Sequence, residues 1–173
     1  APAVVKAFGS GSSIDVFVCK TQDAVDKAID TVVSKHGEAL VEQYIKGPEL
    51  TVGLLEEKPL APIRIVPKNE FFDYEAKYKS KETEHRFDTG LPGDVIQRCQ
   101  DIAKQANDIV GARDLARIDI MLDASNNPFL LEISTLPGFT PVSLLPEAAK
   151  HGGLEFGPLV DRLVKRAAAR GAA

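Results

Sequence analysis

Two carboxylates and an arginine stand in neighbouring apolar segments, at a spacing that could bring them together. Arg117 and Asp119 alternate with apolar residues, and Glu132 lies in the next apolar run. Alternate residues of a strand share a face, so Arg117 and Asp119 point to the same side. With a turn centred between Ser125 and Asn126, Asp119 lies opposite Glu132. Like charges directly opposite each other destabilise a sheet, so this arrangement needs a compensating charge.

A divalent cation could supply that charge. Magnesium takes hard oxygen ligands, typically one or two carboxylates together with substrate phosphates and water. The alternative is that both acids point to solvent and pair with nearby Lys or Arg side chains. The acids are surrounded by Ile, Met and Leu residues, which are not typical of a strand face exposed to solvent. This favours metal binding over the exposed ion pairs. Alternation along the second of these segments likewise predicts that Leu130, Glu132 and Ser134 share one face.

Strands over residues 115–122 and 128–134 would hold these side chains. Further apolar runs predict strands over residues 3–8, 14–19, 40–45, 49–55 and 60–66, the first two forming a hairpin. Apolar residues at helical spacing predict helices between a Thr21 cap and Gly37, over residues 95–110 before Gly111, and over residues 156–167.

Three segments lack a periodic pattern. Residues 67–91 are polar, charged and aromatic, and a loop of this length in a compact domain is usually a functional lid or a disordered segment. Residues 137–141, Pro-Gly-Phe-Thr-Pro, predict a stiff turn. The Ala-, Arg- and Gly-rich residues after the last helix predict a frayed tail.

The composition is that of a soluble globular protein. The chain has 173 residues, is 44% hydrophobic and 27% charged, and carries a formal net charge of −4. This charge gives no general attraction to nucleic acid or to a membrane surface, and no apolar run is long enough to cross a bilayer. Cys19 and Cys99 lack metal-ligand spacing and are expected to be buried thiols, which fits a reducing cytoplasm. The chain opens without Met in an apolar run, so we expect a piece of a longer protein.

Six ordered blocks resemble the D-alanine–D-alanine ligases of the ATP-grasp superfamily, and the resemblance extends over nearly all of residues 4–163. The blocks are residues 5–6 with 11–13, 40–52, 72–78, 116–119, 131–138 and 143–146. The resemblance implies an α+β ATP-grasp fold, in which two α+β lobes with mainly antiparallel sheets grip ATP between them. Residues 1–50 would form part of the small lobe, and residues 51–173 the large lobe with the catalytic and metal site.

The resemblance also implies an activity. Such a ligase joins two D-alanines through an acyl phosphate at the expense of ATP, a step of peptidoglycan synthesis in the bacterial cytoplasm. This chain would supply the ATP- and metal-binding part. An N-terminal substrate domain would be absent, and the isolated fragment would therefore be inactive or nearly so. The implied partners are D-alanine, the missing domain and a second copy of the full-length protein, with no nucleic acid and no membrane.

Residue roles are carried over block by block. The implied ATP-binding residues are Lys6, Glu42, Gln43, Tyr44, Ile45, Glu49 and Lys77. The implied catalytic residues are Arg117, the Gly138 backbone, Ser12 and Tyr78. Ser143 and the Leu144 backbone would bind the carboxylate of the second substrate. Asp119, Glu132 and Ser134 would hold Mg²⁺ or Mn²⁺.

Four residues depart from the pattern of this family. Ala7 stands where Pro is usual, and Asp15 stands where Gly is usual, so that an acid either lies near the phosphates or points away. Ser134 replaces an Asn metal ligand, and its shorter, neutral oxygen would hold an ion less tightly. Val142 replaces a usual His beside Ser143, which bears on the identity of the second substrate.

Three other functions stay open at this point. The chain could be a nucleotide-binding module without catalysis, or an ATP-grasp ligase with another acceptor such as D-lactate. It could also be an α+β domain without a nucleotide site. Binding of ATP that depends on magnesium, and turnover that depends on D-alanine, would separate these alternatives from the ligase.

Overall fold

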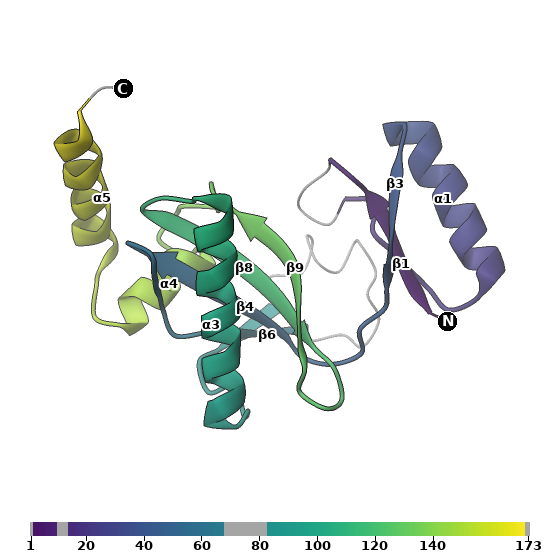
Figure 1. Cartoon of the computed structure of the whole chain (residues 1–173), viewed down its shortest axis with the longest axis horizontal. Coiled ribbons are helices and arrows are strands. Elements are labelled where there is room, and N and C mark those ends of the chain that lie inside the picture. The colour runs from purple at the N-terminus through teal and green to yellow at the C-terminus, as the bar shows by residue number, and fades with distance from the viewer. Residues whose placement is uncertain (1, 10–13, 68–82, 172–173) are drawn as a thin grey trace. The chain divides into compact units, whose positions relative to one another are not determined.

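The computed structural model describes residues 2–9, 14–67 and 83–171, and the chain divides into two compact units (Figure 1). The first unit is Ala1–Ile45 with Pro67–Glu84, and the second is Lys46–Val66 with His85–Ala173. Helices and antiparallel strands make up both, as expected for an α+β fold. Among the described residues, none of the helices combines the length and apolarity needed to cross a bilayer.

The first unit is a three-stranded antiparallel sheet packed against one helix. The sheet order is β2 (Phe17–Cys19), β1 (Ala3–Ala7) and β3 (Ala39–Gln43). Strands β1 and β2 pair as the predicted hairpin. Helix α1 (Gln22–His36) lies along this sheet in Figure 1 and shares an apolar core with it. The core residues are Val5, Ala7, Cys19, Val25, Ala28 and Val32.

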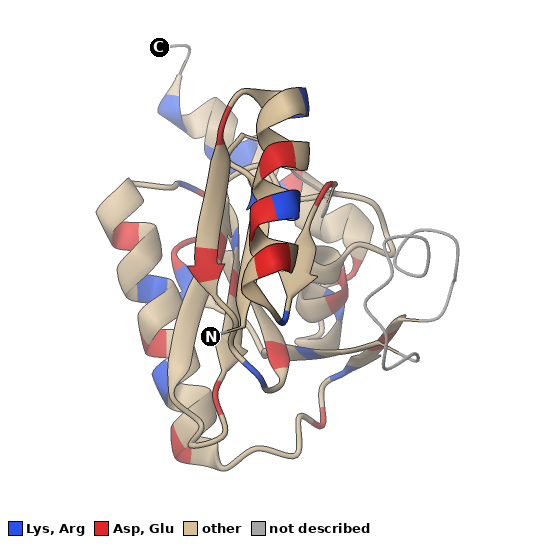
Figure 2. Cartoon of the chain, turned by 90° about the vertical axis from the view of Figure 1, so that its right-hand side faces the viewer, with Lys and Arg blue, Asp and Glu red and all other residues tan. Residues whose placement is uncertain are grey.

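Both ends of α1 are set by the residues that the sequence pattern indicated. The Thr21 hydroxyl accepts a hydrogen bond from the Ala24 N–H at 3.3 Å and caps the N-terminus. Gly37 ends the helix at φ 84°, a left-handed conformation that glycine adopts without strain. Acidic and basic residues follow each other along the helix (Figure 2), as expected for a solvent-facing surface.

The second unit is built on a larger antiparallel sheet. Its strand order is β7–β6–β4–β8–β9, with β5 also paired to β4. The strands are β4 (Glu49–Leu55), β5 (Lys58–Pro59), β6 (Ile63–Pro67), β7 (Thr83–Arg86), β8 (Leu115–Leu122) and β9 (Pro128–Ser134). Strands β8 and β9 have the predicted bounds. Strand β7 corrects the prediction that residues 67–91 have no regular structure, while residues 68–82 lie outside the described part.

The two faces of this sheet differ in character. Helix α3 (Gly93–Val110) covers one face and buries an apolar core against β4 and β8. The core residues are Leu50, Val52, Leu54, Val95, Cys99, Ala103, Ala116, Ile118, Ile120 and Leu122. Because side chains alternate along a strand, the residues between them, such as Thr51 and Asp119, point to the opposite face.

Strand β9 contains a β-bulge next to Glu132. Asp119 pairs with Glu132, whereas Ile120 pairs with Leu130, so Leu131 is an extra residue in the ladder. The predicted pairing of Asp119 with Glu132 is confirmed. The prediction that Leu130 and Glu132 share a face is wrong, because the extra residue reverses the alternation and places Leu130 opposite Ile120.

Two further helices follow the sheet. Helix α4 (Leu144–His151) was not predicted, and α5 (Phe156–Arg170) continues beyond the predicted residue 167. Leu145 and Ala149 of α4 share a small apolar core with Leu55 and Leu159. The two cysteines, on β2 and α3, are buried and free as expected, and burial raises the pKa of each thiol.

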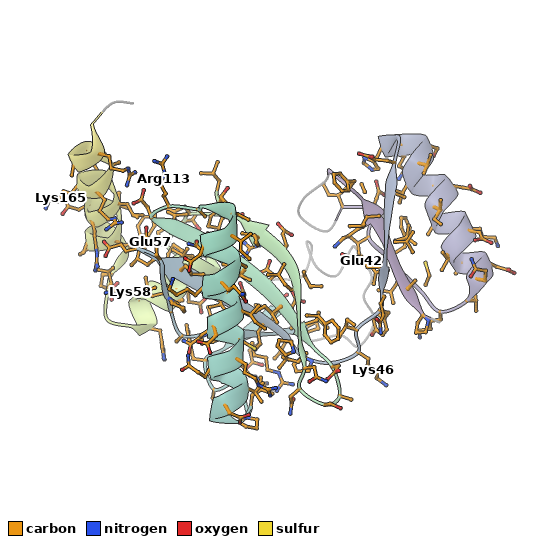
Figure 3. All side chains as sticks on the ribbon, in the orientation of Figure 1. Glu42, Lys46, Glu57, Lys58, Arg113 and Lys165 are labelled. Carbon is orange, nitrogen blue, oxygen red and sulfur yellow. The ribbon has the colours of Figure 1, made fainter. Side chains whose placement is uncertain are left out.

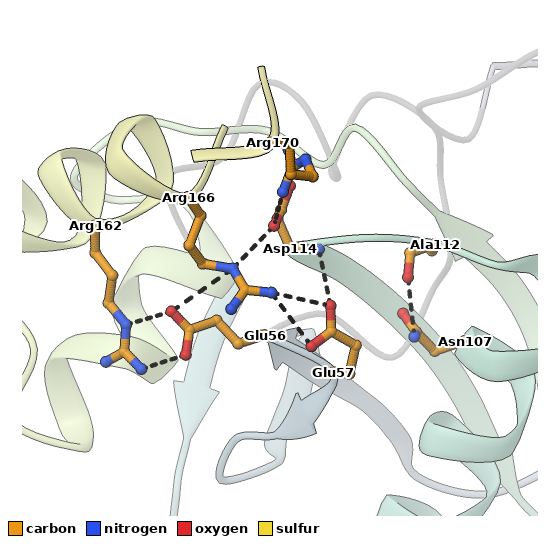
Figure 4. Close-up of polar contacts among 8 residues, drawn as sticks. All are labelled: Glu56, Glu57, Asn107, Ala112, Asp114, Arg162, Arg166 and Arg170. Atoms are coloured by element: carbon orange, nitrogen blue, oxygen red, sulfur yellow. Dashed lines mark hydrogen bonds and ion pairs between the residues drawn. The ribbon is translucent and has the colours of Figure 1, made fainter. Parts of the chain in front are cut away.

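Three arginines spaced four residues apart hold α5 against two loops of the second unit (Figure 4). Arg170 binds Asp114 at 2.6 Å, and Arg166 contacts Asp114 at 3.0 Å. The other pairs are Arg166 with both Glu56 and Glu57, and Arg162 with Glu56. The last residues of α5 are therefore anchored, and the prediction of a frayed tail is wrong for them. Neither loop is near α5 in sequence, so periodicity could not indicate these pairs.

This ionic cluster predicts acid-dependent stability. The Arg170 guanidinium, followed by Arg166, lowers the pKa of Asp114 against the opposing effect of burial. A carboxyl whose folded-state pKa is lowered stabilises the fold above its unfolded pKa, about 4, and this contribution disappears as the pH falls through the folded-state pKa. We expect Asp114→Asn to lower the free energy of unfolding at pH 7 by about 1 kcal/mol, because the arginines are partly exposed to solvent. The difference from wild type should shrink below pH about 4.

Urea unfolding at pH 7 and pH 3 checks this prediction. Asn accepts the left-handed backbone of Asp114 (φ 67°), so the substitution tests the charge alone. Asp108→Asn is the matched control, because Asp108 forms an exposed pair with Lys104 within α3. A loss at Asp114 that is the same at both pH values would contradict the assignment.

Candidate functional site

A strip of polar side chains crosses three neighbouring strands on the face of the second sheet that points away from α3. Asp119 pairs with Thr51 on one side and with Glu132 on the other, and Arg117 pairs with Ser134. The strip consists of Glu49 and Thr51 of β4, Arg117 and Asp119 of β8, and Glu132 and Ser134 of β9. Five of these six residues were predicted as site residues. Thr51 was not.

The Asp119 carboxylate is held in one orientation by two neighbours. The Thr51 hydroxyl donates to its Oδ1 at 2.6 Å, and the Arg117 guanidinium donates to Oδ1 at 3.0 Å and to Oδ2 at 2.7 Å. Thr51 is buried, with 2% of its surface exposed. A carboxylate that is fixed in this way needs little reorganisation to bind a ligand. Thr51 could be recognised as a site residue only from its position opposite Asp119, and that position is known only once β4 is paired with β8.

Arg117 carries the permanent positive charge of the strip. Burial would lower the pKa of Arg117, but its hydrogen bonds to Asp119 and the charge of that acid outweigh burial. The charges of Glu132 and Glu49 act in the same direction and help to raise the pKa above its ordinary value. Arg117 therefore supplies part of the compensating charge that the opposed acids require.

The two facing carboxylates, Asp119 and Glu132, suit a magnesium ion that takes its other ligands from bound phosphate and water. The Asp119 side chain is 16% exposed, and Glu132, directly opposite, is exposed and reachable from solvent. Within the described ranges, no three or more His, Cys, Asp or Glu side chains form a cluster that could hold a metal ion. Two carboxylates with phosphate and water are nevertheless the typical magnesium environment, so these residues fit the ion once a polyphosphate is bound.

The loop after β9 leads into α4 and carries the next predicted residues. The Ser143 Oγ accepts a hydrogen bond from the Thr140 N–H at 3.0 Å and lies 2.8 Å from the Thr140 hydroxyl. Gly138 is close by, because a Cβ built there would lie 3.5 Å from the Ser143 Oγ. Ser143 occupies the N-cap position of α4, yet its side chain forms no cap bond to the helix. The N-terminus of a helix attracts anions, including carboxylates.

In the first unit, the structure brings Lys6 and Glu42 together. The Lys6 Nζ lies 2.7 Å from a carboxylate oxygen of Glu42, which Figure 3 shows on β3. Both residues lie on the sheet face away from α1, because their neighbour Val5 points into the core with that helix. Gln43 ends β3 and is exposed. The Tyr44 N–H donates to the Pro2 carbonyl at 3.2 Å.

Asp15, the acid that departs from the family pattern, is bound by the last turn of α1. His36 lies 2.8 Å and Lys35 2.9 Å from its carboxylate oxygens, and these two contacts, His36 first, lower the pKa of Asp15. Its φ of 52° lies in the left-handed region, which explains why glycine would also suit this position. The carboxylate thus has its own hydrogen-bond partners in α1.

The remaining predicted residues fall into two groups. Ile45 is half-buried in the first unit, and Leu144 is the first residue of α4. Ser12, Lys77 and Tyr78 lie outside the described residues. Two residues of the loop before α4, Leu136 and Val142, are 91% and 83% exposed.

Comparison with known proteins decides the family. The family model "D-ala D-ala ligase C-terminus" matches residues 1–165. The chain belongs to the D-alanine–D-alanine ligase family. It is 41% identical over 168 residues to a D-alanine–D-alanine ligase of Trichlorobacter lovleyi, covering 96% of this chain and 54% of that relative. A ligase of Gloeobacter violaceus is 38% identical over 166 residues, with 95% of this chain and 55% of the relative covered.

Solved ligases have the same fold, which is the ATP-grasp fold. The D-alanine–D-alanine ligase of Bacillus anthracis matches with a TM-score of 0.83 and 33% identity, over 95% of this chain and 54% of that one. The ligase of the same organism complexed with ATP matches with a TM-score of 0.79 and 27% identity, over 95% and 52%. This ligase-family chain therefore spans about half the length of the relatives that it matches.

Proposed function

We propose that this chain supplies the ATP- and metal-binding part of a ligase that joins two D-alanines to D-alanyl-D-alanine. The observation that carries the proposal is the polar strip, in which Asp119 faces Glu132 across adjacent strands and is oriented by Arg117. The ligase relatives and the ATP complex of the Bacillus anthracis ligase support the nucleotide. The product is a building block of bacterial peptidoglycan, and the reaction belongs in the cytoplasm, where ATP is available.

In the first step, a carboxylate oxygen of the first D-alanine attacks the γ-phosphorus of ATP. The bond from this phosphorus to the bridging oxygen breaks, which gives an acyl phosphate and ADP. Positioning and charge neutralisation account for most of the catalysis of such a transfer. Asp119, Glu132 and Ser134 would hold Mg²⁺ or Mn²⁺, which neutralises phosphate charge when bound. Arg117 donates to the transferring phosphoryl oxygens, and its charge is secured by the acids around it.

In the second step, the amine of the second D-alanine attacks the acyl carbonyl and loses a proton, and inorganic phosphate leaves with the acyl C–O electron pair. The tetrahedral oxyanion is stabilised by Arg117 and the Gly138 N–H, since preorganised donors stabilise charge that develops in the transition state. Ser143 and the Leu144 N–H bind the carboxylate of the incoming amino acid. Ser12 and Tyr78 complete the donor set that encloses the substrates.

The nucleotide is bound by residues of three blocks, which are residues 5–6 with 11–13, 40–52 and 72–78. Lys6 and Lys77 neutralise phosphate charge. Lys6 forms an ion pair with Glu42, and when phosphate is present Lys6 binds the phosphate either instead of Glu42 or together with it. Glu42, Gln43, Tyr44 and Ile45 line the adenine, and Glu49 accepts the ribose hydroxyls. In this proposal residues 1–50 are part of the small lobe and residues 51–173 the large lobe. A further domain brings the first D-alanine, and the full-length protein forms a homodimer.

Phosphate release by the complete natural protein that contains this sequence tests the proposal. We expect release that requires ATP, Mg²⁺ and D-alanine together, with D-alanyl-D-alanine as the product. D-lactate and other amino acids serve as alternative acceptors in the same assay. ATP binding without release under any of these conditions would instead identify a nucleotide-binding module, and the proposal would be wrong.

A further inference from the structure

Two side-chain contacts within the second unit join α4 to the β7 segment, which is residues 85–87 at and just after the end of β7. The His85 Nδ1 lies 2.6 Å from a carboxylate oxygen of Glu147. The Phe87 ring stacks on the His151 ring, with centroids 3.8 Å apart and planes inclined by 3°. His85 and Phe87 are two residues apart on an extended segment, and Glu147 and His151 are one helical turn apart on α4. His85 and Phe87 therefore lie on one side of their segment, Glu147 and His151 lie on one side of α4, and these two sides face each other.

Helix α4 depends on such contacts for its position. It has eight residues, about 12 Å in length, and a helix this short is not stable in water by itself. Its buried face packs Leu145 and Ala149 into the core with α5 and the end of β4. Leu145 also lies over Gly53 of β4, since a Cβ there would be in ordinary van der Waals contact with the Leu145 Cγ at 3.5 Å. The contacts to His85 and Phe87 support the helix from the β7 side.

We infer that His85 and Phe87 are positioning residues for the second amino acid, which they reach through Glu147 and His151. This inference rests on the proposed function, in which Ser143 and the Leu144 N–H bind the carboxylate of that substrate. Glu147 is the fourth residue of α4 and also donates its N–H to the Ser143 carbonyl at 2.9 Å. Anchoring Glu147 therefore anchors the turn that presents Ser143.

The two contacts restrain different motions of the helix. The hydrogen bond between His85 and Glu147 is directional and opposes rotation of α4 about its axis. The parallel stack of Phe87 on His151 opposes tilting at the other end, about 6 Å further along the helix. A displacement of a binding group by about 1 Å is enough to weaken a site substantially.

Steady-state kinetics of the complete protein test the inference. We expect His85→Ala and Phe87→Ala each to raise the KM for the second D-alanine roughly tenfold, with kcat within about twofold of wild type and the KM for ATP unchanged. His85→Asn keeps a donor near the position of Nδ1, and His151→Phe keeps a stacked ring, so both variants should retain the wild-type KM. Lys150→Ala is the matched control, because the Lys150 side chain of the same helix forms an exposed pair with Glu155.

Equal increases in both KM values, or a raised KM in the conservative variants, would overturn the inference. A second measurement on the 173-residue chain separates it from the proposed function. Amide NMR signals of Ser143 and Leu144 should shift in His85→Ala and Phe87→Ala and stay in place in Lys150→Ala. Unmoved signals would refute the positioning role. Shifted signals in a protein that releases no phosphate with D-alanine would refute the proposed function, and the role toward that substrate with it.

Discussion

Asp119→Asn is expected to reduce D-alanine-dependent phosphate release by the complete protein about a thousandfold, equivalent to about 4 kcal/mol of transition-state stabilisation. Asp119 is held in the polar strip by two neighbours, Thr51 and Arg117, which both donate to it. Asn retains one acceptor oxygen for these donors but lacks the charge that a cation requires. The loss should therefore fall on catalysis and metal affinity more than on the fold.

Phosphate release at saturating ATP, together with the Mg²⁺-dependent thermal shift caused by ATP, provides two readouts of this variant. Asp101→Asn is the matched control, since Asp101 is an exposed acid of α3 that accepts a bond from Gln97 of the same helix. Asp119→Asn with more than a tenth of wild-type activity would show that this acid does not bind the metal. A large fall in the melting temperature without nucleotide would instead assign Asp119 a structural role.

Gly47→Ala is expected to lower the free energy of unfolding by about 3 kcal/mol or more. A Cβ built on Gly47 would lie 1.9 Å from the carbonyl oxygen of Leu122, which is part of the backbone and cannot rotate away. The adjacent Pro48 carbonyl accepts a hydrogen bond from the Leu122 N–H at 3.0 Å, so the two segments are held together at this point. Relief of the overlap must break this contact or displace the end of β8, so we place the loss at or above the upper end of the usual overpacking cost of about 1–3 kcal/mol.

Urea unfolding of the 173-residue chain measures this loss. Gly93→Ala is the control with the opposite expected sign, because Gly93 opens α3 and a Cβ there meets nothing within 4 Å. Alanine should leave stability unchanged there or raise it by up to about 1 kcal/mol. Equal stabilities of the two variants would show that the turn at Gly47 adapts to a side chain.

The elements with strong local signals could be predicted from the sequence. Thr21 and Gly37 bound α1 as expected, and the bounds of β8 and β9 agree with the alternating apolar pattern. The pairing of Asp119 with Glu132 was also predicted, but from a turn centre that the structure does not have. The pairs next to the turn, Leu122 with Pro128 and Met121 with Phe129, place its centre at Ser125, and the bulge compensates for the difference.

The elements that were missed depend on contacts between distant parts of the chain. Helix α4 is too short for periodicity to indicate, and it is held by β4, α5 and the β7 segment. The end of α5 is anchored by Asp114, 56 residues before Arg170. Thr51 reaches Asp119 across 68 residues of sequence. Local patterns carry no information about such pairs, which become visible only after the strands are paired.

Because Leu131 is an extra residue in the ladder, the hairpin could become one residue shorter there without changing which side chains lie on its polar face. Were Leu131 deleted, the regular ladder from the turn would still place the glutamate opposite Asp119. Were one residue deleted from the turn instead, the ladder would have to realign, and the glutamate would lose its partner. Relatives that vary in length in this region should therefore tolerate loss at the bulge and resist loss at the tip, since the bulge supplies local twist while the tip sets the alignment.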